Sequence, residues 1–165
     1  MSLREILTQE EINLYNPAYT GFLFLSSLRA YCEVNEQGMH CALPYIVVPM
    51  ALSPRIAASL PTTYRTPIAS WVAEQGGELS DFSAMASACI PVVNAATLFL
   101  LDRKVIQLTE EAYYLIASNE LAKAPSLFNK RESMKQALHA ANFIGKWFAH
   151  SSTVETIYAQ LGIRP

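Results

Sequence analysis

Cysteine and histidine supply the side chains of this chain that could bind a metal ion. Cys32, His40 and Cys41 form the one stretch where both residue types lie near each other in the sequence. Structural zinc sites use two ligand pairs, each with a short and regular spacing. Here the spacing is wrong and a second pair is missing. The sequence therefore predicts no metal site.

Nucleophilic catalysis and nucleotide binding also leave recognisable patterns. The chain has no Gly-x-Ser-x-Gly elbow and no catalytic cysteine signature. Gly76-Gly77 is an isolated pair without the Lys-Ser or Lys-Thr that completes a phosphate loop. A triad assembled from distant residues stays an open alternative. We expect no catalytic residues, no metal and no cofactor.

The cysteines Cys32, Cys41 and Cys89 are odd in number, widely spaced and set among apolar residues. Such a pattern favours free thiols over a disulfide framework. Residues 1–7 are amphipathic and do not resemble a signal peptide. We therefore expect a cytoplasmic protein.

Residues 82–101 carry no charge and are about as long as a membrane-spanning helix. They contain Pro91 and several polar residues, and they lie between Asp81 and Asp102. A pair of buried helices explains this stretch better than a membrane span. We expect no membrane association.

The elements that must position any site are mostly helices. Asn16-Pro17, Ser53-Pro54 and Thr66-Pro67 each read as a helix cap followed by proline at the first helical position. They predict a long apolar helix after residue 17 and short helices near 54–60 and 67–75. In residues 2–15, Thr8 and Glu11 have the spacing of a capping box for a short amphipathic helix.

The middle of the chain predicts helices and one hairpin. Residues 43–52 favour a helix kinked or shortened by Pro49, with a strand as the alternative. Residues 79–102 predict two helices that meet at Ile90-Pro91. Residues 105–108 and 113–116 are β-prone runs separated by polar residues, as in a small hairpin. Short helices followed by a hairpin have the order of a winged helix.

The C-terminal part predicts two helices. Asn129 is a candidate cap for a helix over 130–150, and Ser152 with Glu155 forms a capping box for the last helix, which Gly162 would end. The first of these helices has a stripe of apolar residues, namely Met134, Leu138, Ala141, Ile144 and Phe148. We therefore expect a mainly α fold in a single domain, with N-terminal helices over 1–40, a winged-helix-like part over 41–118 and a C-terminal helical part over 119–165.

Composition points to a large buried surface. Of the 165 residues, 52% are hydrophobic and 16% are charged, against about 25% charged in an average globular protein. A surface covered by another protein is the favoured explanation of this composition, and a large core in a monomer is the alternative. The apolar, aromatic C-terminus supports docking, because termini fray unless they are held.

Charge is distributed unevenly along the chain. Residues 1–102 hold nine acidic and four basic residues, whereas residues 103–165 hold five acidic and eight basic ones. Lys130, Arg131 and Lys135 belong to the basic part and are candidate contacts for DNA phosphates. A solvated helix face is the favoured reading of the same residues, because no aromatic residues interleave them for base stacking.

Several short motifs, in this order, resemble one family, the middle component of three-component ABC (ABC-3C) systems. The motifs are Asn16-Pro17-Ala18-Tyr19, Leu43-Pro44, Leu60-Pro61-Thr62-Thr63, Lys146-Trp147-Phe148-Ala149, Ile157-Tyr158 and Leu161-Gly162-Ile163-Arg164-Pro165. The best-known systems of this kind are the Lamassu-type anti-phage systems, which are built around an SMC- or Rad50-like ABC ATPase. The match is looser over residues 64–90.

The resemblance implies a non-catalytic accessory subunit. Its expected partners are the ATPase, whose head domains engage DNA, and a separate effector that is often a nuclease. Trp147, Phe148, Arg164 and Pro165 are the candidate partner contacts. The alternative is a winged-helix transcriptional regulator that binds DNA directly, although the acidic first half and a pI near 5.9 disfavour it.

Overall fold

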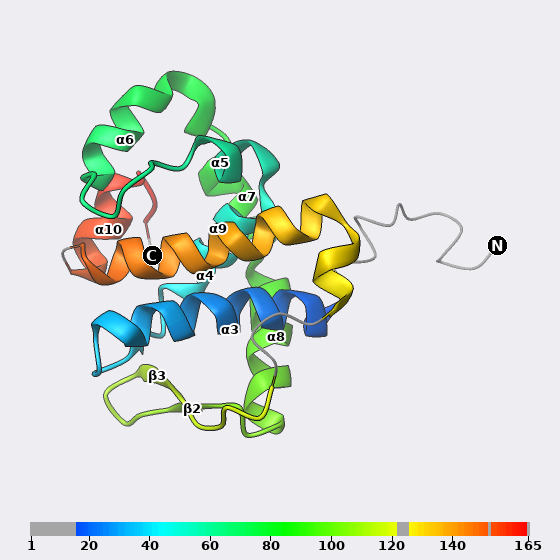
Figure 1. The fold of residues 1–165 in the computed structure, drawn as a ribbon. Coiled ribbons are helices and arrows are strands. Elements are labelled where there is room, and N and C mark those ends of the chain that lie inside the picture. Colours follow the sequence, from blue (N-terminus) through cyan, green and yellow to red (C-terminus); the bar gives the residue numbers. More distant parts are fainter. Residues whose placement is uncertain (1–15, 122–125, 152, 165) are drawn as a thin grey trace.

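The computed structural model describes residues 16–121, 126–151 and 153–164, and within them it contains eight α-helices and one small antiparallel sheet (Figure 1). The predicted mainly α fold class is confirmed. The helix expected over residues 2–15, with Thr8 and Glu11, lies outside the described residues.

The central helix is α3 (Pro17–Val34). The Asn16 side-chain oxygen accepts a hydrogen bond of 3.0 Å from the Ala18 amide, and Pro17 occupies the first turn, as the sequence predicts. Ten of its residues are buried, so α3 has neighbours on nearly every side. Beyond it, Gly38 has a φ of +101°, which permits the turn into β1 (Met39–His40).

Three short helices follow. Residues Pro44–Leu52 form α4, so the strand alternative is wrong, and the helix continues three residues past Pro49. Ser53 caps α5 (Pro54–Ser59) by accepting a hydrogen bond from the Ile56 amide. In contrast, Thr66 does not cap α6 (Ile68–Gln75), because Pro67 holds the cap position and makes no side-chain bond there. Gly76 ends α6, in agreement with the predicted end near residue 75, and a 3₁₀ turn, η1 (Gly76–Leu79), follows.

The uncharged stretch forms α7 (Phe82–Ala88) and α8 (Ile90–Asp102), which meet where the sequence predicts. No single helix of the described residues is long and apolar enough to cross a membrane. Among the described helices, only α7 and α8 together are long and apolar enough to do so, and the two helices are bent by 48° where they meet.

The predicted hairpin is present as β2 (Ile106–Leu108) and β3 (Tyr113–Ile116). The sheet has the order β1-β3-β2, with Met39 opposite Tyr114. The two-residue strand β1 was not predicted, because so short a run has no pattern of its own. Five helices lie between β1 and β2, and the winged-helix likeness of this part stays a prediction.

The C-terminal part consists of η2 (Ser126–Lys130), α9 (Glu132–Ala149) and α10 (Val154–Gln160). The predicted cap Asn129 is wrong, since it belongs to η2 and Arg131 holds the cap position of α9. Thr153 caps α10 by accepting a bond of 3.3 Å from the Thr156 amide. The cap therefore lies one residue beyond Ser152, which is outside the described residues.

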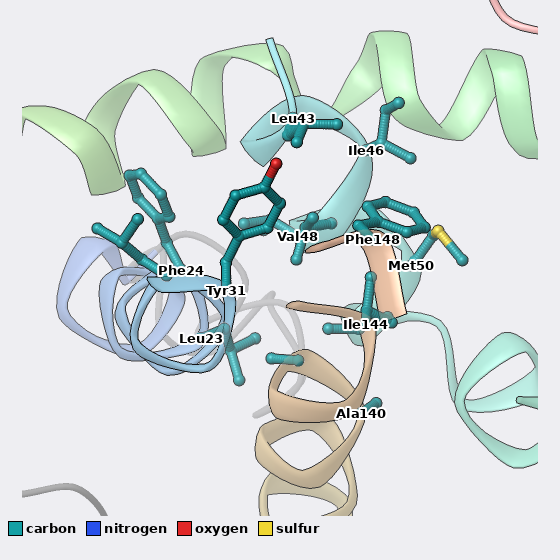
Figure 2. Packing of buried hydrophobic residues seen from close by; sticks show 14 of the residues in the cluster. Leu23, Phe24, Tyr31, Leu43, Ile46, Val48, Met50, Ala140, Ile144 and Phe148 are labelled. Carbon is teal, nitrogen blue, oxygen red and sulfur yellow. The ribbon is translucent and has the colours of Figure 1, made fainter. Parts of the chain in front are cut away.

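The core forms where α3, α4 and α9 meet, and Figure 2 shows their apolar side chains pointing toward one another. Four of the five residues in the predicted stripe of α9 are buried, and Leu138 is partly buried. Along the crossing, Gly145 of α9 lies against the backbone of Ser27 in α3. The glycine allows these two long helices to approach closely.

Candidate functional site

The aromatic end of α9 lies inside the chain's own core. Trp147 is 0% exposed and Phe148 is 1% exposed. The Trp147 Nε1–H donates a hydrogen bond of 2.7 Å to the Thr66 carbonyl, and its ring meets the edge of Trp71 at 5.4 Å between centroids. Trp71 in turn donates to the Ser59 carbonyl at 2.8 Å. Burial removes Trp147 and Phe148 as candidates for a direct partner contact.

The last helix is held in a similar way. Ile157, Tyr158 and Leu161 are buried, and the Tyr158 hydroxyl donates a 2.6 Å hydrogen bond to the Ala42 carbonyl just before α4. Burial raises the pKa of Tyr158 to about 12, so the hydroxyl keeps its proton at neutral pH. The sequence therefore correctly indicated a docked terminus, and its docking site is the chain itself.

The backbone after α10 turns sharply at Gly162, whose φ is +72°. The Gly162 amide donates to the Ala159 carbonyl at 3.1 Å, and the Ile163 amide donates to the Tyr158 carbonyl at 3.0 Å. This bond pair is a Schellman motif, which needs a left-handed residue at the position that Gly162 occupies. The predicted helix stop is confirmed, and the turn directs Ile163 and Arg164 back across the molecule.

Arg164 is exposed and lies at a pocket of about 420 Å³ between α4, the junction of α7 with α8, and the C-terminal segment. Its lining comprises Cys41, Ala42, Tyr45, Ile46, Ala86, Ser87, Ile90, Tyr158, Ile163 and Arg164. The pocket is mainly apolar, and Arg164 is the single charged residue among the described residues that line it. Of the predicted contacts, Arg164 is thus the one at an accessible site, while Pro165 lies outside the described residues.

The predicted phosphate contacts lie at another place. Lys130, Arg131 and Lys135 are exposed around the end of η2 and the first turn of α9, where free backbone amides add positive potential. Glu132 lies among them and offsets part of the charge. Lys146, at the opposite end of α9, is 3.0 Å from the Glu33 carboxylate, which raises the pKa of Lys146. The structure brings the first three cations together and separates Lys146 from them.

A second pocket, of about 620 Å³, lies between the loop before α6 and the ends of α9 and α10. Its wall includes Tyr64, Arg65 and His150, and the Tyr64 ring stacks on His150 with a centroid distance of 6.0 Å. Sequence reasoning did not find this pocket. Its residues come from segments far apart in the chain, and no local pattern joins them.

The residues with metal-binding or nucleophilic chemistry are engaged in packing. All three cysteines are free, and burial raises the pKa of the Cys32 and Cys89 thiols, which keeps them protonated and weakly nucleophilic at neutral pH. His40 accepts a hydrogen bond of 3.1 Å from the Ala42 amide through Nδ1. These residues have structural contacts, and we assign no reaction to them.

Comparison with protein families adds the identity that the geometry alone does not provide. The family model of the ABC-three component (ABC-3C) system Middle Component 3 matches residues 4–165. The chain belongs to this family. A search of curated proteins and of solved structures found no match. The resemblance to a middle component of an ABC-3C system is therefore confirmed.

The motifs that resemble the Middle Component 3 family largely meet in one region. The Thr66 carbonyl, just beyond the Leu60-Pro61-Thr62-Thr63 motif, receives the bond from Trp147, and Ala42, just before Leu43-Pro44, receives the bond from Tyr158. Most motif residues of this middle component thus stabilise its fold. Among the described motif residues, Asn16, Thr62, Thr63, Gly162 and Arg164 are exposed, and Arg164 is the one of these five that lines the apolar pocket.

Proposed function

We propose that this Middle Component 3 chain is a non-catalytic accessory subunit that binds the ABC ATPase of its system and restrains or licenses an effector. The observation that carries this proposal is the family match over residues 4–165. A middle component belongs to a system of several components, and the low fraction of charged residues suits a surface covered by another protein.

The proposal includes a finer assignment. The ATPase is of the SMC or Rad50 type, the system is a Lamassu-type anti-phage system, and the complex contacts DNA through the ATPase. The effector is a nuclease in many systems of this kind. A cytoplasmic location is part of the proposal, because an odd number of unpaired cysteines suits a reducing compartment.

Co-expression tests the central statement. The chain and the ATPase component of the same system, purified together, should elute from size-exclusion chromatography as one complex at physiological salt. The chain without the ATPase should elute separately and should show no ATP hydrolysis. Separate elution of the two proteins at micromolar concentrations would contradict the proposal.

A DNA-binding regulator is the second candidate function, and the exposed cluster of Lys130, Arg131 and Lys135 favours it. Direct binding through these residues predicts affinity for duplex DNA that falls steeply as salt rises, because each phosphate contact releases counterions. Lys130→Glu with Arg131→Glu should then weaken binding, whereas Arg65→Glu should not. If the isolated chain has no measurable affinity for DNA at low salt, this second function is excluded.

A further inference from the structure

One face of α8 exposes apolar side chains. Ile90 is 44% exposed and Leu98 is 60% exposed, and Asn94 lies between them at the same four-residue interval. Residues four and eight apart fall on one side of a helix, so the three form a ridge about 12 Å long. Five large hydrophobic residues are exposed among the described residues, and two of them are on this ridge.

The ridge is continuous with the pocket at Arg164. Ile90 belongs to both, and the Tyr45 hydroxyl, from the pocket wall, donates a 2.6 Å hydrogen bond to the Asn94 side-chain oxygen. The buried residues Ile46, Ala86 and Tyr158 are also part of the lining. A hollow with an apolar lining, beside a ridge that exposes Ile90 and Leu98 on either side of Asn94, is the shape that receives a side chain of an amphipathic helix.

Charge restricts what this surface can bind. Among the described residues that line the pocket, Arg164 is the single charged one, it is exposed, and none is acidic. An incoming carboxylate would find a guanidinium beside apolar surface, where a charge-assisted bond is stronger than in open water. A second copy of this chain that used the same surface would offer Arg164 no carboxylate, because the described residues of this surface include none.

We infer that the surface formed by Ile90, Asn94, Leu98 and the pocket at Arg164 binds an amphipathic helix of the ATPase component. That helix places an apolar side chain in the pocket and a carboxylate on the Arg164 guanidinium. The inference rests on the proposed function, which supplies the partner, and adds the surface and the chemistry of the segment that occupies it.

The test measures the affinity of the full chain for the purified ATPase component by isothermal titration calorimetry. Leu98→Glu and Arg164→Glu should each weaken binding at least about tenfold, as central contacts of an interface do. Arg164→Lys, which keeps the charge, should weaken it less than Arg164→Glu. Leu108→Glu is the matched control, because Leu108 is 50% exposed on β2 and lies outside this surface. The Leu108→Glu variant should bind the ATPase component with the same affinity as the unchanged chain.

A second measurement does not depend on substitutions. Cys41 lines the pocket and is partly exposed, whereas Cys32 is partly exposed on α3. Addition of the ATPase component should slow alkylation of Cys41 at least several-fold and leave the rate at Cys32 unchanged. Mass spectrometry of the alkylated peptides separates the two sites. Thermal unfolding of each variant confirms that the substitutions leave the fold intact.

The outcomes separate the two proposals. If the unchanged chain binds the ATPase but Leu98→Glu and Arg164→Glu bind equally well and Cys41 is not protected, this inference is wrong and the proposed function stands. If the unchanged chain does not bind the ATPase, both are wrong. If analytical ultracentrifugation shows a dimer of the chain alone that Leu98→Glu dissociates, the occupant is a second copy and the inference is overturned.

Discussion

At the scale of single residues, Gly145 determines how closely the two longest helices approach. A Cβ atom at this position would lie 2.9 Å from the Ser27 Cα and closer still to the Ser27 carbonyl oxygen. Both are backbone atoms of a buried helix, so they cannot rotate away as a side chain could. The crossing of α3 and α9 therefore depends on the missing side chain.

Gly145→Ala should lower the free energy of unfolding by about 1–3 kcal/mol, because overpacking outweighs the better helix propensity of alanine. Urea denaturation followed by circular dichroism measures the difference. Gly77→Ala is the control, since among the described atoms none outside its two chain neighbours lies within 4 Å of the added Cβ. The free energy of unfolding of this variant should differ from that of the unchanged chain by less than about 0.5 kcal/mol. Equal effects of the two substitutions would contradict the role of Gly145.

Tyr158 makes the stability depend on pH at the alkaline end. Its pKa is about 12 in the folded chain and 10.0 as the ordinary value. Because the pKa is higher in the folded chain, the unfolded chain loses this proton first as pH rises. The contribution of Tyr158 to the free energy of unfolding is therefore complete below pH 10 and is lost as pH rises toward 12. For this one group, the free energy of unfolding falls by at most about 1.4 kcal/mol per pH unit.

Tyr158→Phe should remove this part of the pH dependence. Unfolding by urea at pH 9 and near pH 11 should show a smaller decline in stability for the variant than for the unchanged chain, although Tyr31 and Tyr114 also titrate. At neutral pH the variant should be about 1 kcal/mol less stable, because the Ala42 carbonyl loses its donor. Identical pH profiles would show that the hydroxyl is not buried as described.

At the scale of elements, the helix caps show that local sequence predicts some helix starts correctly and others wrongly. Asn16 and Asn129 both precede a helical pattern, and only Asn16 caps its helix. Asn129 is displaced by η2, whose residue Phe128 is buried and stacks on Tyr19 of α3 at 5.6 Å. This packing across the chain overrides the local signal.

Asn16→Ala should cost about 1 kcal/mol of stability, because the first turn of α3 loses the acceptor for the Ala18 amide. Asn129→Ala should be close to neutral, since the residue is exposed and caps no helix. Paired thermal unfolding curves distinguish the two. A larger loss of stability for Asn129→Ala than for Asn16→Ala would indicate that Asn129 caps α9 after all.

At the scale of the whole molecule, the C-terminal helix completes the core. Ile157, Tyr158 and Leu161 are all at most 8% exposed. Burial of a large apolar side chain is worth about 1.5–3 kcal/mol, so the three together approach the net stability of about 5–15 kcal/mol that a domain has.

A chain that ends at Ser151 should therefore lose cooperative unfolding and bind a hydrophobic dye such as ANS. Near-ultraviolet circular dichroism should show weaker signals from Trp71 and Trp147, which lie in contact near α10. Arg164→Ala, in contrast, removes only an exposed side chain and should unfold like the unchanged chain. A truncated chain that still unfolds cooperatively would contradict this account of α10.

The sequence by itself determined the elements whose signals act within a few residues. Asn16, Ser53 and Gly162 each set a helix end through bonds to residues two to five positions away, and such bonds depend on local backbone geometry alone. It also indicated that the aromatic terminus docks. An amphipathic pattern shows which face of a helix is buried, but it does not show which other element packs against that face.

Only the tertiary structure decided which of those residues face inward. Trp147 meets Thr66 across 81 positions and Tyr158 meets Ala42 across 116, and no local pattern encodes either pairing. The same long-range packing buries Trp147 and Phe148, leaves Arg164 exposed and brings it to a pocket with Ile90. The candidate surface therefore exists only in the folded chain, because its residues come from helices that are distant in the sequence.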